Sequence, residues 1–167
     1  GRILKFETTG YASSLIATFT IDGAAQAGSN PAIVSYGLFG GTSMILDLGF
    51  TSSTTKPQFQ FKNAGGSYVT LLGTVNLAAG LHTMCCTSDG VNTITLWADG
   101  VLITSNAAAG APFAATSSNV MLIGAENYNT ITGRLFRGSL GNVMAFNRAL
   151  SASDIQRLST APVTGLR

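Results

Sequence analysis

The chain has 167 residues, of which 46% are hydrophobic and 10% are charged, and its formal net charge is +2. The hydrophobic residues occur in short stretches between Gly, Ser, Thr and Asn, which excludes a membrane-inserting helix. The basic residues form no dense stripe, which argues against nucleic acid as a partner. The length fits one domain, residues 1–167, and the short apolar stretches favour an all-β protein.

Alternating apolar and polar residues predict about ten strands along the chain. In residues 14–21, for example, Leu15, Ala17, Phe19 and Ile21 share one face. Gly-containing turns separate the strands, and the second and third strands are predicted to form a hairpin. The predicted strands are residues 14–21, 32–36, 43–48, 58–62, 68–72, 82–87, 93–98, 101–103, 120–124 and 138–146.

One short helix is predicted at the C-terminal end of the pattern. Ser151 and Asp154 have the spacing of a capping box, with Asp in place of the usual Glu. Leu150 and Ile155 can form the hydrophobic staple, and we expect the helix to run to about Leu158 as a short lid.

The chain has two cysteines, Cys85 and Cys86, which are adjacent. Neighbouring residues of a strand point to opposite faces, so this pair has poor geometry for a mutual disulfide and we expect free thiols. The beginning of the chain, Gly1-Arg2-Ile3, has neither a Met nor a signal peptide. We therefore expect a domain excised from a longer polypeptide.

Four blocks of the second half, in this order, resemble the laminin-G-like and pentraxin-like jelly rolls of the concanavalin A-like lectin/glucanase superfamily. They are residues 80–102, 121–127, 136–143 and 147–155. The resemblance implies a two-sheet antiparallel jelly-roll sandwich with one short C-terminal helix. Such blocks build the fold, so function needs a separate argument from a site.

The pentraxin branch of this superfamily binds calcium through an acidic loop, and Glu126 and Asn127 match positions of that loop. Tyr128 stands where the pentraxin pattern has another carboxylate. Calcium prefers six to eight oxygen ligands, so a metal site at Glu126 and Asn127 would be depleted. The resemblance thus implies that calcium is possible but that no cofactor is required, and the alternative is that Glu126 is a solvated turn residue.

Catalytic chemistry has little support in the sequence. Glycoside hydrolysis needs two opposed carboxylates, yet the chain has only Glu7 and Glu126 as glutamates, and most of its Asp residues fall in turn or capping positions. The sole histidine, His82, lies three residues before Cys85, which places the two on opposite faces of a regular strand. We expect no enzyme activity.

Two candidate ligand-binding sites remain. Alternation places Trp97 on the outward face of its strand, where an aromatic ring can stack on a sugar. The alternative is that a loop or the helix covers Trp97. The second candidate is a predicted loop, residues 126–130, which joins an aromatic ring to amide and hydroxyl groups. With Arg134 added, its ligand-binding candidates are Glu126, Asn127, Tyr128, Asn129 and Arg134.

These observations favour a non-catalytic carbohydrate or cell-surface recognition module with a glycan or cell-surface polysaccharide as its ligand. We expect the parent to be a phage tail fibre, acting in host attachment, or a secreted bacterial protein. The predicted location is therefore the virion or the extracellular space. The alternative is a structural or assembly module, such as a virion decoration or a knob that forms homo-oligomers through the parent protein.

Overall fold

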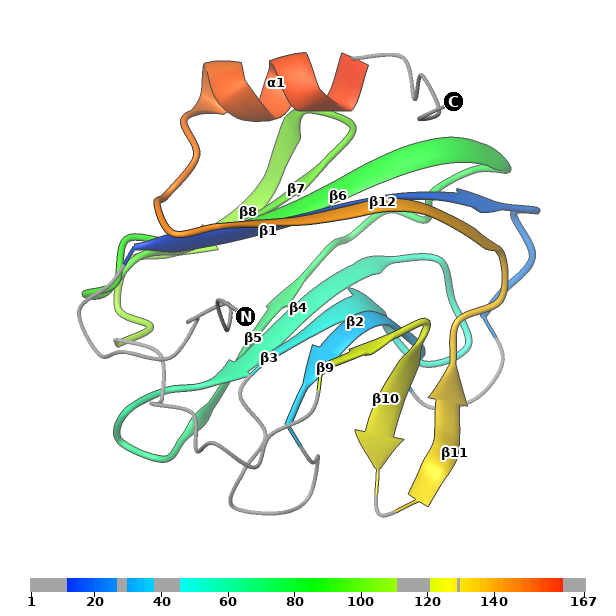
Figure 1. Ribbon diagram of the computed structural model, residues 1–167, viewed down its shortest axis with the longest axis horizontal. Helices are drawn as coiled ribbons and strands as arrows, with labels where there is room; N and C mark the ends of the chain where they lie inside the picture. The colour runs from blue at the N-terminus through cyan, green and yellow to red at the C-terminus, as the bar shows by residue number, and fades with distance from the viewer. Residues whose placement is uncertain (1–11, 27–29, 38–45, 111–120, 129, 161–167) are drawn as a thin grey trace, which may run out of the picture.

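The structure is a computed structural model that describes residues 12–26, 30–37, 46–110, 121–128 and 130–160, except for the side chains of 126–128 and 130–133. Two β-sheets pack face to face, and one helix, α1 (Ala152–Thr160), lies on the outer face of one of them (Figure 1). The predicted two-sheet jelly-roll sandwich is confirmed. The strands are β1 (Ser13–Ile21), β2 (Ala32–Tyr36), β3 (Leu46–Phe50), β4 (Pro57–Lys62), β5 (Tyr68–Leu72), β6 (Gly80–Ser88), β7 (Ile94–Ala98), β8 (Val101–Asn106), β9 (Met121–Ile123), β10 (Ala125–Tyr128), β11 (Thr130–Leu135) and β12 (Ser139–Phe146).

Five strands form the sheet next to the helix, which we call sheet A, in the order β12-β1-β6-β7-β8. The strand β1 pairs antiparallel with the central strand β6 along its whole length, with Leu15 opposite Cys86 and Ala17 opposite Met84. On its other side β1 pairs with β12 through a bulge. First and last strands thus lie side by side, which closes the sandwich.

The second sheet, sheet B, has the order β10-β11-β2-β3-β4-β5, and β9 pairs with β2 off this path. The predicted hairpin of the second and third strands is confirmed, because β2 pairs antiparallel with β3. A single parallel contact joins β11 to β2, where Leu135 lies opposite Ala32. The hairpin of β10 and β11 extends beyond the body of the sandwich (Figure 1).

The main core lies between the two sheets and draws on both of them. Phe19 from sheet A meets Phe50 from sheet B edge to face, with 5.6 Å between ring centroids. Leu15, Leu48 and Phe61 are also fully or almost fully buried there. Burying a side chain of this size contributes about 1.5–3 kcal/mol, so the inward face of each strand is what holds the sandwich together.

A second, smaller cluster lies on the other side of sheet A, beneath α1. Its buried members are Ile16, Cys85, Leu150 and Ile155. Cys86, in contrast, belongs to the main core, so the adjacent cysteines face opposite sides of the sheet, as predicted. Both thiols are free, and burial raises the pKa of Cys85 to about 12.

The predicted capping box of the helix is confirmed. The Ser151 hydroxyl accepts a hydrogen bond from the Asp154 amide at 3.1 Å, and the Ser151 amide donates to Asp154 Oδ2 at 3.2 Å. Leu150 and Ile155 lie in the same cluster, as a hydrophobic staple requires. The helix ends at Thr160, slightly later than predicted.

Several predicted boundaries change. The third strand begins at Leu46 within the described residues, and its predicted start and the turn before it lie outside them. Asp47, which falls within the predicted strand of residues 43–48, lies inside β3 and is 1% exposed. In the part of the chain that the structure describes, no helix is long and apolar enough to span a membrane.

Candidate functional site

The outer face of sheet B carries polar side chains, whereas its inner face carries core residues. On β4, Phe59 and Phe61 point into the main core. Because side chains alternate along a strand, Gln58, Gln60 and Lys62 project from the opposite face. The antiparallel register continues this face onto β5. The alternation that made these residues recognisable as a strand thus also produces a polar surface.

A row of four polar residues crosses this face from β2 to β5. Ser35 lies opposite Asp47, Asp47 opposite Gln60, and Gln60 opposite Thr70. Ser35 and Asp47 are 2% and 1% exposed, so the row is deeply covered at one end. It opens to solvent at β5, where Thr70 is exposed.

Hydrogen bonds fix the side chains of this row. The Ser35 hydroxyl donates to the carbonyl oxygen of Ala125 at 2.9 Å, and Gln60 Nε2 donates to Thr70 Oγ1 at 2.9 Å. Gln60 Oε1 is buried and has no hydrogen-bond partner among the described residues. A buried acceptor without a donor is costly, so this oxygen lowers the stability of the folded protein.

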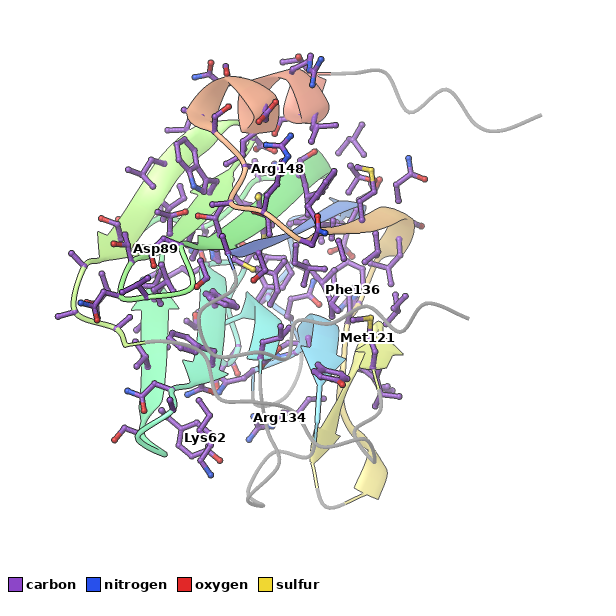
Figure 2. All side chains as sticks on the ribbon, turned by 60° about the vertical axis from the view of Figure 1, so that its left-hand side comes forward. Lys62, Asp89, Met121, Arg134, Phe136 and Arg148 are labelled. Carbon is purple, nitrogen blue, oxygen red and sulfur yellow. The ribbon has the colours of Figure 1, made fainter. Side chains whose placement is uncertain are left out.

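An aromatic ring lies at the open end of the row. Tyr68, on β5, is 43% exposed and lies opposite Lys62 in the register. The Lys62 ammonium is 5.6 Å from the centre of the Tyr68 ring, within cation–π range. Lys62 lies on the side of the molecule remote from α1 (Figure 2). We call Gln60, Lys62, Tyr68 and Thr70 the β4–β5 patch.

Arg134 is one of the predicted site residues, and the structure places it on β11. It lies opposite Glu126 in the β10–β11 ladder, so the two predicted site residues are paired across adjacent strands. Its side chain is 8% exposed, which is unusual for an arginine. Arg134 and Lys62 both lie in the lower part of the molecule, remote from α1 (Figure 2).

The loop predicted for residues 126–130 is wrong. Residues 126–128 belong to β10 and Thr130 begins β11, with Tyr128 opposite Thr130. Asn129 lies outside the described residues, as do the side chains of Glu126, Asn127 and Tyr128. Their role in ligand binding stays a prediction. Sequence reasoning missed these strands because Glu and Asn are depleted in strands.

Trp97 lies on sheet A, away from the other predicted site residues. It is partly buried against the cluster beneath α1, beside Ile16, Cys85 and Ile155. Its indole Nε1 donates to Thr95 Oγ1 at 2.6 Å. This is the arrangement expected if the helix covers Trp97, so the residue has a packing role, and its proposed role in ligand binding stays a prediction.

Calcium binding at Glu126 and Asn127 likewise stays a prediction. The two residues are consecutive positions of a strand rather than parts of a loop that can wrap around an ion. A calcium ion needs six to eight oxygen ligands. Within the described residues, no three His, Cys, Asp or Glu side chains come together as a metal site.

His82 makes a structural pair with Asp99. Its Nδ1 is 2.7 Å from Asp99 Oδ2, and its Nε2 is 2.9 Å from the carbonyl oxygen of Ala78. The second carboxylate oxygen of Asp99 accepts a hydrogen bond from the Thr83 amide at 2.8 Å. Both ring nitrogens are thus occupied, which leaves neither to activate a nucleophile.

The sequence contained a signal for the β4–β5 patch. Residues 58–62 alternate cleanly and end at a hairpin loop followed by Tyr68, so the register of Tyr68 beside Lys62 follows from the pattern. From the sequence alone, Tyr36 and Tyr68 are weaker binding candidates than Trp97, because both could be packing residues of their strands.

Solved structures with the same fold include a CBM40 domain of a sialidase and the binding domain of a botulinum neurotoxin. The CBM40 domain of the Ruminococcus gnavus IT-sialidase, bound to α2,3-sialyllactose, is similar with a TM-score of 0.73 and 14% identity, covering 89% of this chain and 83% of that one. The leech intramolecular trans-sialidase, complexed with 2,7-anhydro-Neu5Ac, gives 0.69 and 17%, covering 92% and 24%. The binding domain of botulinum neurotoxin serotype G gives 0.66 and 9%, covering 95% and 38%. At these identities the likeness shows the fold alone.

No curated protein sequence matches the chain. A family profile does match it, over residues 9–156, and this profile describes the concanavalin A-like lectin/glucanases superfamily. The match covers most of the chain and agrees with the two-sheet architecture and its closing helix. The chain belongs to the concanavalin A-like lectin/glucanases superfamily.

Proposed function

We propose that this protein is a non-catalytic carbohydrate-recognition module that binds glycans on the outer face of sheet B. The observation that carries the proposal is the β4–β5 patch, where the exposed Tyr68 ring lies beside an ammonium, an amide and a hydroxyl. Aromatic rings stack on the apolar faces of sugars, while polar groups bind the hydroxyls. The exposed Thr70 hydroxyl and the Lys62 ammonium supply polar groups for such hydroxyls beside the ring.

The similar structures support this proposal by what their names state. One is a carbohydrate-binding domain with bound sialyllactose, and another is the binding domain of a neurotoxin. We extend glycan recognition from them to this chain as a proposal. It places the protein outside the cell or on a virion, as part of a secreted bacterial protein or a phage tail fibre that attaches to a host.

The absence of catalysis is part of the same proposal. Several described aspartates already bind the backbone of turns or caps: Asp89 Oδ1 accepts from three backbone amides at 2.8 to 2.9 Å, and Asp154 caps α1. A glycosidase needs two carboxylates free to act on one bond. The engagement of these side chains supports a module that binds its ligand without cleaving it.

Glycan-array binding tests the proposal with three variants. Tyr68→Ala removes the stacking surface and is expected to lower binding about fivefold or more, because a well-placed aromatic contact is worth about 1 kcal/mol or more. Tyr68→Phe keeps the ring and should retain most of the binding. Tyr128→Ala tests the role predicted for β10.

The proposal would be overturned if the wild-type protein bound no glycan on the array, or if Tyr68→Ala bound as strongly as the wild type. If Tyr128→Ala alone loses binding, the site lies at the β10–β11 hairpin rather than at the β4–β5 patch. Thermal melting of each variant establishes that it is folded.

One observation favours a second candidate, an assembly module that forms homo-oligomers. The edge strand β8 exposes three consecutive apolar residues, Val101, Leu102 and Ile103, at 63%, 47% and 37%. Unpaired apolar edges invite pairing with another chain. Mass measurement in solution tests this: a stable oligomer that dissociates in Leu102→Lys favours assembly, and a monomer favours recognition.

A further inference from the structure

A polar cleft, separate from the β4–β5 patch, lies at the end of the sandwich where three connections meet. These are the segment after β1, the turn between β3 and β4, and the segment between β5 and β6, at the right of Figure 1. The cleft has a volume of about 220 Å³. Its lining residues are Gly23, Ala25, Ser53, Thr54, Thr55 and Asn76. We call it the end cleft.

Hydrogen bonds tie the walls of the end cleft to one another. The Thr55 amide donates to Asn76 Oδ1 at 3.2 Å, and the Thr55 hydroxyl donates to the carbonyl oxygen of Leu77 at 2.8 Å. From the third wall, the amide of Gln26 donates to the carbonyl oxygen of Thr54 at 3.2 Å. Because hydrogen bonds join three separate segments, the cleft is preformed rather than a gap between mobile loops.

Two side chains of the lining keep hydrogen-bonding capacity for a ligand. Asn76 uses its carbonyl oxygen for Thr55, and its amide nitrogen makes no hydrogen bond to any other residue that the structure describes. Ser53 is exposed, and its hydroxyl likewise has no partner in the described part of the chain. Ser53 is also held at φ +55°, a left-handed conformation that few residues other than Gly, Asn and Asp adopt.

The chemistry of this lining selects a class of ligand. Among the residues that the structure describes, the lining includes no charged side chain, so an ion would lose its hydration without gaining a counter-charge. An apolar molecule would leave the amide and hydroxyl groups without partners. A small, neutral molecule with several hydroxyl groups satisfies both conditions. The volume suits a single sugar ring, since pockets for drug-sized ligands occupy about 300–1,000 Å³.

We propose that the end cleft is a second carbohydrate subsite, specific for one neutral sugar residue. The inference rests on the carbohydrate function proposed above and extends it to a position separate from the β4–β5 patch. Tyr68 and Leu72 lie at opposite ends of β5, about 13 Å apart at about 3.3 Å per residue, and Asn76 follows Leu72. None of the described residues that line the cleft is aromatic, so we expect no contribution from stacking. The expected dissociation constant is therefore about 1–10 mM, a binding free energy of about 4 kcal/mol or less.

Amide chemical shifts measured during titration with single sugars test the inference. The probes are N-acetylglucosamine, methyl β-galactoside and methyl α-mannoside, with glycerol as a polyol of lower complexity. At least one sugar should give saturable shifts at the amides of Ser53, Thr54 and Asn76. Absence of saturable shifts with all three sugars, or equal shifts with glycerol, would overturn the inference.

A matched pair of variants locates the binding. Ala25→Leu places a larger side chain in the end cleft and should weaken sugar binding at least about tenfold. Ala24→Leu alters a neighbouring exposed residue of the same segment that does not line the cleft, so its binding should equal that of the wild type. Equal binding by the two variants would contradict the inference.

Ser53→Gly separates binding from folding. Glycine relieves the positive φ, so this variant should be at least as stable as the wild type while it binds the sugar more weakly through loss of the hydroxyl. Tyr68→Ala separates the two sites: it should weaken array binding and leave the shifts at the end cleft unchanged. If Tyr68→Ala weakens both, the end cleft is not an independent subsite. If array binding persists while no sugar shifts these amides, the inference fails and the proposed function stands.

Discussion

The two sheets differ in what they do with their outer faces. On sheet A the outward side chains of Ile16 and Cys85 are apolar, and Ile155 of α1 packs on them to complete a closed cluster. On sheet B a row of polar residues occupies the outer face, and α1 lies on the other side of the molecule (Figure 1). That row is Ser35, Asp47, Gln60 and Thr70.

This difference separates stability from recognition within one fold. Both sheets contribute the same kind of inward residue to the main core, so the inner faces say nothing about function. The outer face of sheet A is used to hold the helix, and burial there contributes to folding. The outer face of sheet B keeps polar groups and an exposed ring, which is the composition of a binding surface. Substitutions on the two faces should therefore affect different measurements.

Ile155→Ala should produce the largest effect, because Ile155 is 0% exposed and joins α1 to sheet A. Truncation of a buried isoleucine costs about 2–5 kcal/mol of unfolding free energy. Chemical denaturation measures this loss. Fluorescence of Trp97, the single tryptophan, should shift to longer wavelength if the helix detaches.

Gln156→Ala is the matched control for that variant, since Gln156 is exposed on the same helix. It should leave both stability and fluorescence almost unchanged. The comparison of the sheets further predicts that folded Ile155→Ala binds glycans like the wild type. Loss of binding in a folded Ile155→Ala protein would show that the two faces are not independent.

Gly49→Ala tests the framework beneath the polar row, because Gly49 follows Asp47 and Leu48 on β3. A Cβ atom at this position would overlap the carbonyl oxygen of Pro31 and lie 2.8 Å from Cα of Ala32. Backbone cannot yield as a flexible side chain can, so a cost of about 1–3 kcal/mol is expected from thermal melting. Gly65→Ala is the control, since its nearest neighbour is a side-chain oxygen of Asn63 at 3.3 Å. Equal melting temperatures of the two variants would refute the steric account.

Trp97→Phe has a smaller expected effect on stability and sharpens the comparison directly. The variant keeps an aromatic ring in the cluster beneath α1 and loses the hydrogen bond to Thr95, a change of about 0.5–1.5 kcal/mol. Circular dichroism during denaturation measures it. Array binding should be unaffected, because Trp97 lies on sheet A. A loss of binding would move the site to Trp97, the candidate that sequence reasoning placed first.

The sequence was sufficient to predict most of the fold, for a physical reason. Strands 32–36 and 68–72 are predicted with their observed bounds, because one buried face imposes a period of two and turn residues limit its extent. The helix start follows from Ser151 and Asp154, which act locally. The strands β10 and β11 could not be found in this way, because residues 126–130 lack an alternating apolar face.

The candidate site was less predictable. Alternation tells which strand residues share a face, and it placed Trp97 outward as observed. Whether another element then covers that face depends on where α1 packs, which is a property of the tertiary structure. Tyr68 is the converse case: the hairpin pattern places it beside Lys62, but its 43% exposure is a property of the tertiary structure.

Asp154→Asn should give the smallest effect, one that depends on pH. Hydrogen bonds from Arg148 and from the Ser151 hydroxyl hold the pKa of Asp154 at about 2, below its ordinary value of 3.8. A carboxylate with a lowered pKa stabilises the folded protein above its unfolded-state pKa, and this contribution is lost as the pH falls toward the folded-state value. The wild type should therefore melt higher than the variant above about pH 4, and the difference should shrink between pH 3.8 and pH 2. Melting curves from pH 2 to pH 7 measure this, and a constant difference would show that the charge of Asp154 does not stabilise the helix.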